Sequence, residues 1–230
     1  MSETTPPPAA PAPAGNGDRA DAVYRFTAQQ VLKLQRDRDQ SGSGGSRAVA
    51  LLARLRRVAT AEPGTDPGVW DATLDGAPGS PSDGRISEPT REERAIHLAL
   101  AMYATAQQGV ADAAHAQGAG LGTAVQQLER LRPGAGDSGR SPVRRRFDAL
   151  ATATDLPELA VHLRGLVTQM RGTTARLDYA RLASDLFWYQ VPGRAGSVRR
   201  TWARDFYALR GQDDRSASAA PTNDTTSKEN

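Results

Sequence analysis

The chain has 230 residues, of which 38% are hydrophobic and 5% aromatic, so its core must consist mainly of leucine, valine and alanine. It contains no cysteine, which excludes disulfides, thiol chemistry and cysteine-based metal sites. Neither a run of about 18 apolar residues nor an N-terminal apolar segment of signal-peptide type is present. We therefore expect a soluble cytoplasmic protein that forms one large domain or two small ones.

The formal net charge is +3, and each of the terminal segments 1–21 and 211–230 carries a formal −2. This leaves about +7 on residues 22–210, nearly all of it on arginine, because Lys33 and Lys228 are the only lysines. Arginine binds phosphate in bidentate fashion and stacks on bases, which suits a nucleic-acid surface. A GC-rich genome would also supply arginine, and it explains the overall excess equally well, but it explains the clustering of arginines less well.

The composition divides the chain into five segments. Residues 1–21 and 211–230 are polar or rich in proline and alanine, and they cannot bury enough surface to offset the entropy of ordering, so both are predicted to be disordered tails. Between them we expect an N-terminal helical part (22–109), a connecting region (110–140) and a C-terminal helical bundle (141–210).

Two helices are predicted near the start of the ordered part. Thr27 and Gln30 have capping-box spacing, so a short helix should begin at Thr27. Ser46 can cap a second helix from residue 47 to about 60, whose leucines recur at helical spacing on a different face from its arginines.

Residues 62–89 are rich in glycine, proline and aspartate, which predicts a long loop with one short helix around Trp70. Thr90 and Glu93 form another capping box, which starts a strongly apolar helix to about residue 108 with Gly109 as the C′ residue. This helix is apolar on much of its circumference, so we expect it to be central.

Residues 110–122 are ambiguous, and helices are expected over 123–131 and from 143 to about 153. Asp155 with Glu158 is the clearest N-cap signature in the chain and begins a helix to about Met170. Asp178 can cap residues 179–188, and Ser197 can cap residues 198–209. No stretch alternates with a period of two, so the fold class is all-α, a helical bundle that could divide into two small bundles near 110–140.

Catalysis is poorly supported. The three histidines, His97, His115 and His162, are scattered, and neither a helical metal-binding histidine pair nor a glycine-rich phosphate loop with its lysine occurs. We predict no catalytic residue, no metal site and no cofactor.

Three clusters of arginine are the stronger signal. If helix packing brings them onto one surface, they form a groove for a phosphate backbone without base readout; the alternative is that each cluster is simply an exposed helix face. The clusters are Arg54, Arg56 and Arg57; Arg144, Arg145 and Arg146; and Arg199, Arg200 and Arg204.

A series of short motifs follows one another along residues 22–209. The motifs are Leu55-Arg56-Arg57, the helix from Glu92 to Ala106, Leu121-Gly122-Thr123-Ala124, Arg145-Arg146-Phe147, Leu163-Arg164, Leu177-Asp178-Tyr179 and Trp202-Ala203-Arg204-Asp205-Phe206-Tyr207. In this order they resemble the small subunit of type I-E CRISPR Cascade, the CasB family.

The resemblance implies a non-enzymatic helical protein present in two copies in a crRNA-containing complex. Its implied partners are the backbone subunits, the large subunit, a second copy of itself and the displaced non-target DNA strand, with no membrane. It would hold that strand and stabilise the R-loop. The implied phosphate contacts are Arg56, Arg57, Arg144, Arg145 and Arg146, followed by Arg91, Arg164, Arg199 and Arg200.

Two other functions are open at this stage. The first is a purely structural adaptor whose arginines contact acidic patches on protein partners without touching nucleic acid. The second is a DNA-binding regulator with a helix-turn-helix, for which residues 179–188 and 198–209 are the only candidate pair. Their connection over residues 191–196 is longer than such turns usually are.

Overall fold

The computed structural model describes residues 15–80, 88–132 and 140–218, and within these residues it contains helices and no strand. The predicted all-α fold is confirmed. An isolated β-bridge joins His115 to Leu177. The elements are α1 (Asn16–Arg38), α2 (Ser43–Arg57), the 3₁₀ turn η1 (Pro67–Val69), α3 (Trp70–Thr73), α4 (Arg91–Ala106), α5 (Leu121–Leu131), α6 (Pro142–Thr152), α7 (Leu156–Met170), α8 (Tyr179–Gln190) and α9 (Ala195–Ser218).

Three of the predicted helix starts are confirmed by their capping bonds, which satisfy backbone N–H groups that have no partner inside the helix. At α4, the Glu93 N–H donates to Thr90 Oγ1 at 3.2 Å and the Thr90 N–H donates to Glu93 Oε2 at 2.7 Å. At α7, the Glu158 N–H donates to Asp155 Oδ1 at 2.8 Å. At α8, Asp178 accepts from two backbone N–H groups.

The predicted start of the first helix is wrong. Helix α1 begins at Asn16, so residues 16–21 are helical rather than part of a tail, and Thr27 is fully buried in mid-helix. The reason is tertiary: Ala20, Val23 and the buried positions that follow at helical spacing pack on the core, and the Arg19 guanidinium pairs with the buried carboxylate of Glu92. Residues 1–14 lie outside the described part of the chain.

The ends of two other helices also differ from the prediction. Helix α2 begins at Ser43, not after Ser46, and α9 begins at Ala195, so Ser197 is inside the helix and does not cap it. The Ser197 hydroxyl instead accepts from Arg200 Nη2 at 2.9 Å. Helix α9 continues to Ser218, past the predicted start of the tail at residue 211, and residues 219–230 are outside the described part.

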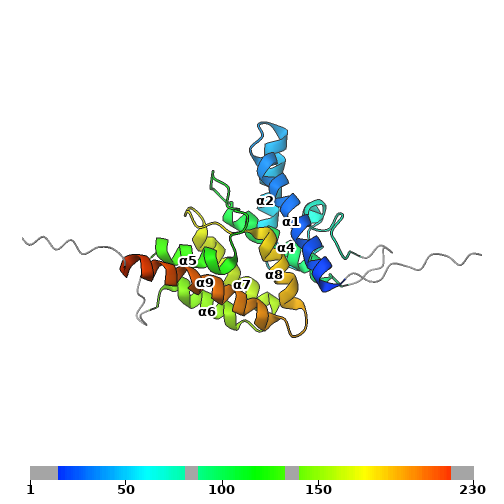
Figure 1. The fold of residues 1–230 in the computed structure, drawn as a ribbon. Coiled ribbons are helices and arrows are strands. Elements are labelled where there is room, and N and C mark those ends of the chain that lie inside the picture. Colours follow the sequence, from blue (N-terminus) through cyan, green and yellow to red (C-terminus); the bar gives the residue numbers. More distant parts are fainter. Residues whose placement is uncertain (1–14, 81–87, 133–139, 219–230) are drawn as a thin grey trace, which may run out of the picture.

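The helices pack in two groups that share one hydrophobic core. Helices α1, α2, α4 and α8 form the first group and α5, α6, α7 and α9 the second, joined where α4 meets α7 and α8 meets α9 (Figure 1). Helix α4 is buried along almost its whole length, as expected. The two groups do not correspond to the parts of the chain before and after residues 110–140. Helix α8 comes from the C-terminal part but packs on α1 and α4.

Helices α5 and α9 approach each other closely at Gly122. A Cβ atom built on Gly122 would lie 2.0 Å from the carbonyl oxygen of Trp202 and 2.7 Å from the backbone nitrogen of Phe206. Only a residue without a side chain fits against the partner backbone here. Two motifs far apart in the sequence, 121–124 and 202–207, therefore form one contact.

We expect Gly122→Ala to lower the free energy of unfolding by about 2–3 kcal/mol or more, because backbone rather than a flexible side chain must move. Urea unfolding measures this. Gly17→Ala is the matched control, since a Cβ at Gly17 meets nothing within 4 Å and should cause no loss. Equal stability of the two variants would contradict the close approach.

A half-buried carboxylate, that of Asp185, links α8 to α9. The Trp202 Nε1–H donates to Asp185 Oδ2 at 2.7 Å, and burial raises the pKa of Asp185 to about 6 from its ordinary 3.8. Because the folded-state pKa is raised, the ionised carboxylate opposes folding. This unfavourable contribution is absent below about pH 4 and develops as the pH rises to about 6.

Asp185→Asn retains an acceptor for Trp202 and cannot ionise. Its stability relative to the parent chain should therefore rise between pH 4 and pH 7, by on the order of 2–3 kcal/mol. Denaturant unfolding of both chains at the two pH values gives this difference. A difference that does not change with pH would mean that Asp185 titrates as an ordinary carboxylate.

Candidate nucleic-acid interface

Four arginines, from α2, α7 and the residue after α7, line one surface hollow of about 390 Å³. Arg56 and Arg57 come from the last turn of α2, where the helix dipole favours cations. Arg164 comes from α7, and Arg171 directly follows that helix. No acidic residue is among the lining residues, which are Ala53, Arg56, Arg57, Thr105, Gln108, Arg164, Thr168 and Arg171. We call this hollow the basic hollow.

Positive charge in the basic hollow is not neutralised by its own lining. Burial, followed by the charges of Arg57 and Arg171, lowers the pKa of Arg56. Arg171 Nη1 donates to Gln108 Oε1 at 2.9 Å, which is a neutral acceptor. An anion with several oxygens would relieve the repulsion and accept the guanidinium hydrogen bonds.

The local sequence explains how the arginines come to face the same space. On α2, Leu52 and Leu55 are buried, which leaves Arg56 and Arg57 toward the surface. On α7, residues 164 and 171 are seven apart, two helical turns, so they share a face while the leucine stripe is buried on another. Helix α4 packs against both α2 and α7 and brings them together.

The Arg144 side chain makes its contacts with other residues of the chain. Its Nε donates to Asp148 Oδ1 at 2.8 Å and its Nη2 donates to the Tyr207 hydroxyl. Its Cζ lies 4.7 Å from the Phe206 ring centroid and 5.0 Å from that of Tyr207. The side chain is 17% exposed, so Arg144 joins α6 to α9.

The two neighbouring arginines are exposed. Arg145 Nη1 donates to the Arg140 carbonyl oxygen at 3.0 Å. Arg146 lies over Gly165 of α7, where an added Cβ would come within 2.3 Å of its Nη1. The structure thus separates the predicted Arg144–Arg146 cluster into one internal and two surface side chains.

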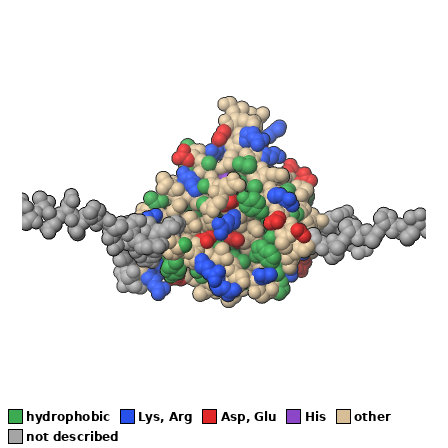
Figure 2. Space-filling view, in the orientation of Figure 1, with side chains coloured by type: hydrophobic (Ala, Val, Ile, Leu, Met, Phe, Trp, Pro, Cys, Tyr) green, Lys and Arg blue, Asp and Glu red, His purple; other side chains and the backbone are tan. Residues whose placement is uncertain are grey.

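The other predicted contacts lie apart from the basic hollow. Arg199 is half-buried, and its Nη2 donates to the Ala153 carbonyl oxygen and to the Tyr189 hydroxyl. Arg200 is exposed, and Arg91 is half-buried at the start of α4. None of these three lines the basic hollow. Figure 2 accordingly shows basic side chains in several separate patches on one face, with acidic side chains between some of them.

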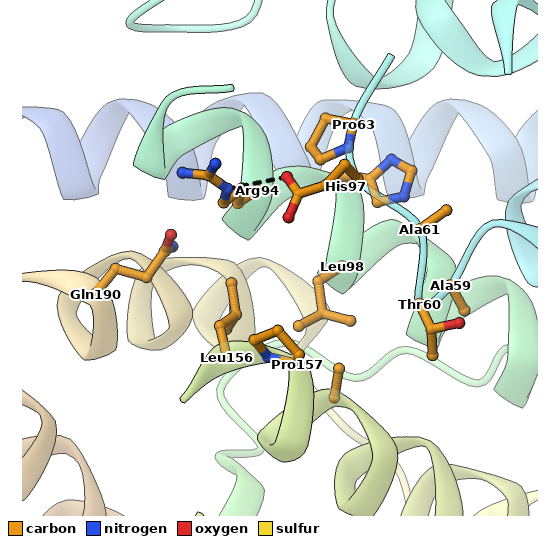
Figure 3. Close-up of a pocket in the computed structure, with 12 residues that line it drawn as sticks. Ala59, Thr60, Ala61, Pro63, Arg94, His97, Leu98, Leu156, Pro157 and Gln190 are labelled. Carbon is orange, nitrogen blue, oxygen red and sulfur yellow. Dashed lines mark hydrogen bonds and ion pairs between the residues drawn. The ribbon is translucent and has the colours of Figure 1, made fainter. Parts of the chain in front are cut away.

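A second cavity, of about 330 Å³, lies between α4, α7, the end of α8 and residues 59–63 (Figure 3). Arg94 Nε pairs with Glu62 Oε2 at 3.0 Å at this cavity. His97 is buried, its Nε2–H donates to the Val58 carbonyl oxygen at 2.9 Å, and burial lowers the pKa of the imidazole. His97 is therefore neutral and fixes the segment after α2 to α4.

Across the described residues, no group of three or more histidine, aspartate or glutamate side chains is arranged to hold a metal ion. In the same part of the chain, no helix combines the length and apolarity needed to cross a membrane.

The sequence model of CRISPR-associated protein Cse2 matches residues 51–207. This chain belongs to the Cse2 family. CasB from Thermobifida fusca is 33% identical with a TM-score of 0.63, covering 81% of this chain and 98% of that chain. CasB from Thermus thermophilus is 25% identical with a TM-score of 0.54, covering 79% and 97% respectively. No curated protein sequence matches the chain.

A chain in a structure described as a CRISPR RNA-guided surveillance complex is 19% identical to this chain, with a TM-score of 0.61. The match covers 85% of this chain and 99% of that chain. That likeness shows a shared fold. The predicted resemblance to the CasB family is confirmed, and the family match includes every residue that lines the basic hollow.

The predicted site set omitted several residues of the basic hollow. Arg171 shares its α7 face with Arg164, and the seven-residue spacing could have identified it. The sequence does not single out Thr105, Gln108 or Thr168, because an uncharged polar residue by itself does not indicate a binding site. Their role follows only from the packing of α4 beside α7.

Arg144→Ala should lower the free energy of unfolding by about 1–2 kcal/mol, because it removes the cation–π contacts between α6 and α9 and the ion pair with Asp148 inside α6. Arg145→Ala, one residue away and exposed, should leave stability within about 0.5 kcal/mol of the parent. Thermal or urea unfolding of the two variants distinguishes the roles. If both variants matched the parent, Arg144 would be a surface residue like Arg145.

Proposed function

We propose that this Cse2 family chain is the non-catalytic small subunit of a type I-E CRISPR RNA-guided surveillance complex (Cascade) in the cytoplasm. In this proposal it binds the displaced non-target DNA strand and stabilises the R-loop in antiviral defence. Its partners would be the crRNA-containing complex, the backbone and large subunits, and a second copy of itself. Family membership and the fold shared with a chain of a surveillance complex support this assignment.

The observation that carries the proposal is the basic hollow. Four arginines line it and no acid does, and burial together with the charges of Arg57 and Arg171 lowers the pKa of Arg56, so the hollow favours a polyanion over an uncharged ligand. Guanidinium groups suit phosphate oxygens in particular because they donate paired hydrogen bonds. Contacts of this kind hold a backbone without reading its sequence.

Contacts of modest strength are sufficient for such a role. Exchange of a DNA duplex for an RNA–DNA heteroduplex is nearly balanced in free energy, so protein contacts to a backbone can tip it. Base pairing between the guide RNA and the DNA would select the target, and this subunit would prolong the lifetime of the R-loop. The contacts should weaken as salt rises, because phosphate binding releases counterions.

The test uses Arg57→Ala combined with Arg171→Ala in the reconstituted complex, since both side chains are exposed and the fold should tolerate their loss. R-loops should dissociate about tenfold faster, given the strength of charged hydrogen bonds. The slope of log affinity against log salt should fall by about 1–1.5. Permanganate footprinting should show a less protected displaced strand.

Arg36→Ala combined with Arg47→Ala is the matched control, because it removes the same charge from exposed residues outside the basic hollow. Unchanged R-loop lifetime and footprint in the Arg57/Arg171 variant would refute strand binding at the hollow. Failure of that variant to assemble, with normal strand protection in whatever complex forms, would instead indicate a structural adaptor that contacts protein partners.

A further inference from the structure

A third hollow continues from the basic hollow along α2. It measures about 380 Å³ and shares Arg56 and Gln108 with the basic hollow. Its remaining lining residues are mostly aliphatic side chains and backbone: Arg38, Val49, Leu52, Gln107, Gly109, Val110 and Ala111. We call it the aliphatic hollow. The two hollows adjoin at Arg56 and Gln108, and we refer to this chemically different pair together as the groove.

The wall of the aliphatic hollow opposite α2 is fixed before any ligand arrives. Gln107 Nε2 donates to the carbonyl oxygens of Val110 and Asp112, both at 2.9 Å. Arg38 Nη2 donates to the Ala111 carbonyl oxygen at 2.8 Å. Gly109 has φ +67°, which allows the chain to turn directly after α4. A preformed wall reduces the entropy lost on binding.

The opposite wall presents apolar surface to solvent. Val49 of α2 is 55% exposed and lies in the aliphatic hollow beside the buried Leu52. At the junction, Gln108 Oε1 accepts from Arg171, and the Gln108 Nε2 amide donates to no other described residue. An amide donor thus stands between the apolar and the basic halves.

We propose that the groove holds an unpaired nucleotide of single-stranded DNA, with its phosphate among the arginines of the basic hollow and its base against the aliphatic hollow. The inference rests on the proposed function for its polyanionic ligand and adds a base site to it. A duplex cannot use that site, because its bases are stacked and paired inside the helix. The groove therefore selects unpaired strand over duplex.

Charge and shape favour a nucleic acid strand over a protein segment. Five arginines and no acid line the combined groove. Arg38 is paired with the neighbouring Asp39, so a peptide would need several carboxylates beside an apolar side chain to match the other four. A single nucleotide combines a phosphate and a flat base. Base contacts of this kind tolerate any sequence, because every base has an apolar face.

The test measures binding of the full chain to labelled DNA by fluorescence anisotropy. The probes are a single strand of about a dozen nucleotides, the same strand with abasic sites throughout, and the corresponding duplex. The parent chain should bind the natural strand at least several-fold more tightly than either of the other two. Equal affinity for the natural and abasic strands would overturn the base site.

Val49→Ser removes apolar surface from the aliphatic hollow, and the exposed position should tolerate it. It should weaken binding of the natural strand about three- to tenfold and leave abasic binding unchanged. Leu32→Ser is the matched control, because Leu32 is 52% exposed on α1 and lines neither hollow. If both variants lost affinity for the natural strand to the same extent, or if neither did, a base contact at Val49 would be contradicted.

The arginine variant separates this inference from the proposed function. Arg57→Ala combined with Arg171→Ala should weaken binding of the natural strand and binding of the abasic strand by the same factor. If the arginine variant shows this equal loss and Val49→Ser does not change DNA binding, the phosphate site is supported and the base site is refuted. If neither variant changes DNA binding but both block assembly of the complex, the groove holds a protein segment and both proposals fail.

Discussion

The buried carboxylate of Asp178 ties the start of α8 to the segment that precedes α5. It is 1% exposed, caps α8 through the backbone N–H groups of Ala180 and Arg181, and accepts from the Gly118 N–H at 2.7 Å. One side chain thereby anchors both the start of α8 and the irregular segment that leads into α5. Without these partners an ionised group would be buried alone, which is strongly unfavourable.

This anchor has consequences for the basic hollow. Residues 171–178 connect α7 to α8, so Arg171 lies at the beginning of a link whose far end Asp178 fixes. Helix α4 packs between α2, α7 and α8, and its nearly complete burial leaves little freedom for α2 to slide past α7. The spacing of Arg56 and Arg164 is therefore a property of the core, and the groove is rigid because the core is.

The sequence predicted the helical class, the central place of α4 and the capping residues Thr90, Asp155 and Asp178, because those signals are local. It misplaced the start of α1, since burial of Thr27 depends on helices far along the chain. It also grouped arginines by proximity in sequence, whereas the structure ties the half-buried Arg144 and Arg199 to partners within the fold. Arg56 and Arg171 meet only through tertiary packing, which no local spacing reveals.

The placement of α8 among the N-terminal helices also bears on how the chain folds during synthesis. The apolar faces of α1 and α4 are covered by α8, which ends at Gln190, about a hundred residues after α4 begins. Until that helix emerges from the ribosome, the first three-quarters of the chain cannot complete a core. Contacts so distant in sequence slow folding and leave apolar surface open to other chains meanwhile. The protein must therefore fold late and as a whole, even though its helices look like two separable halves.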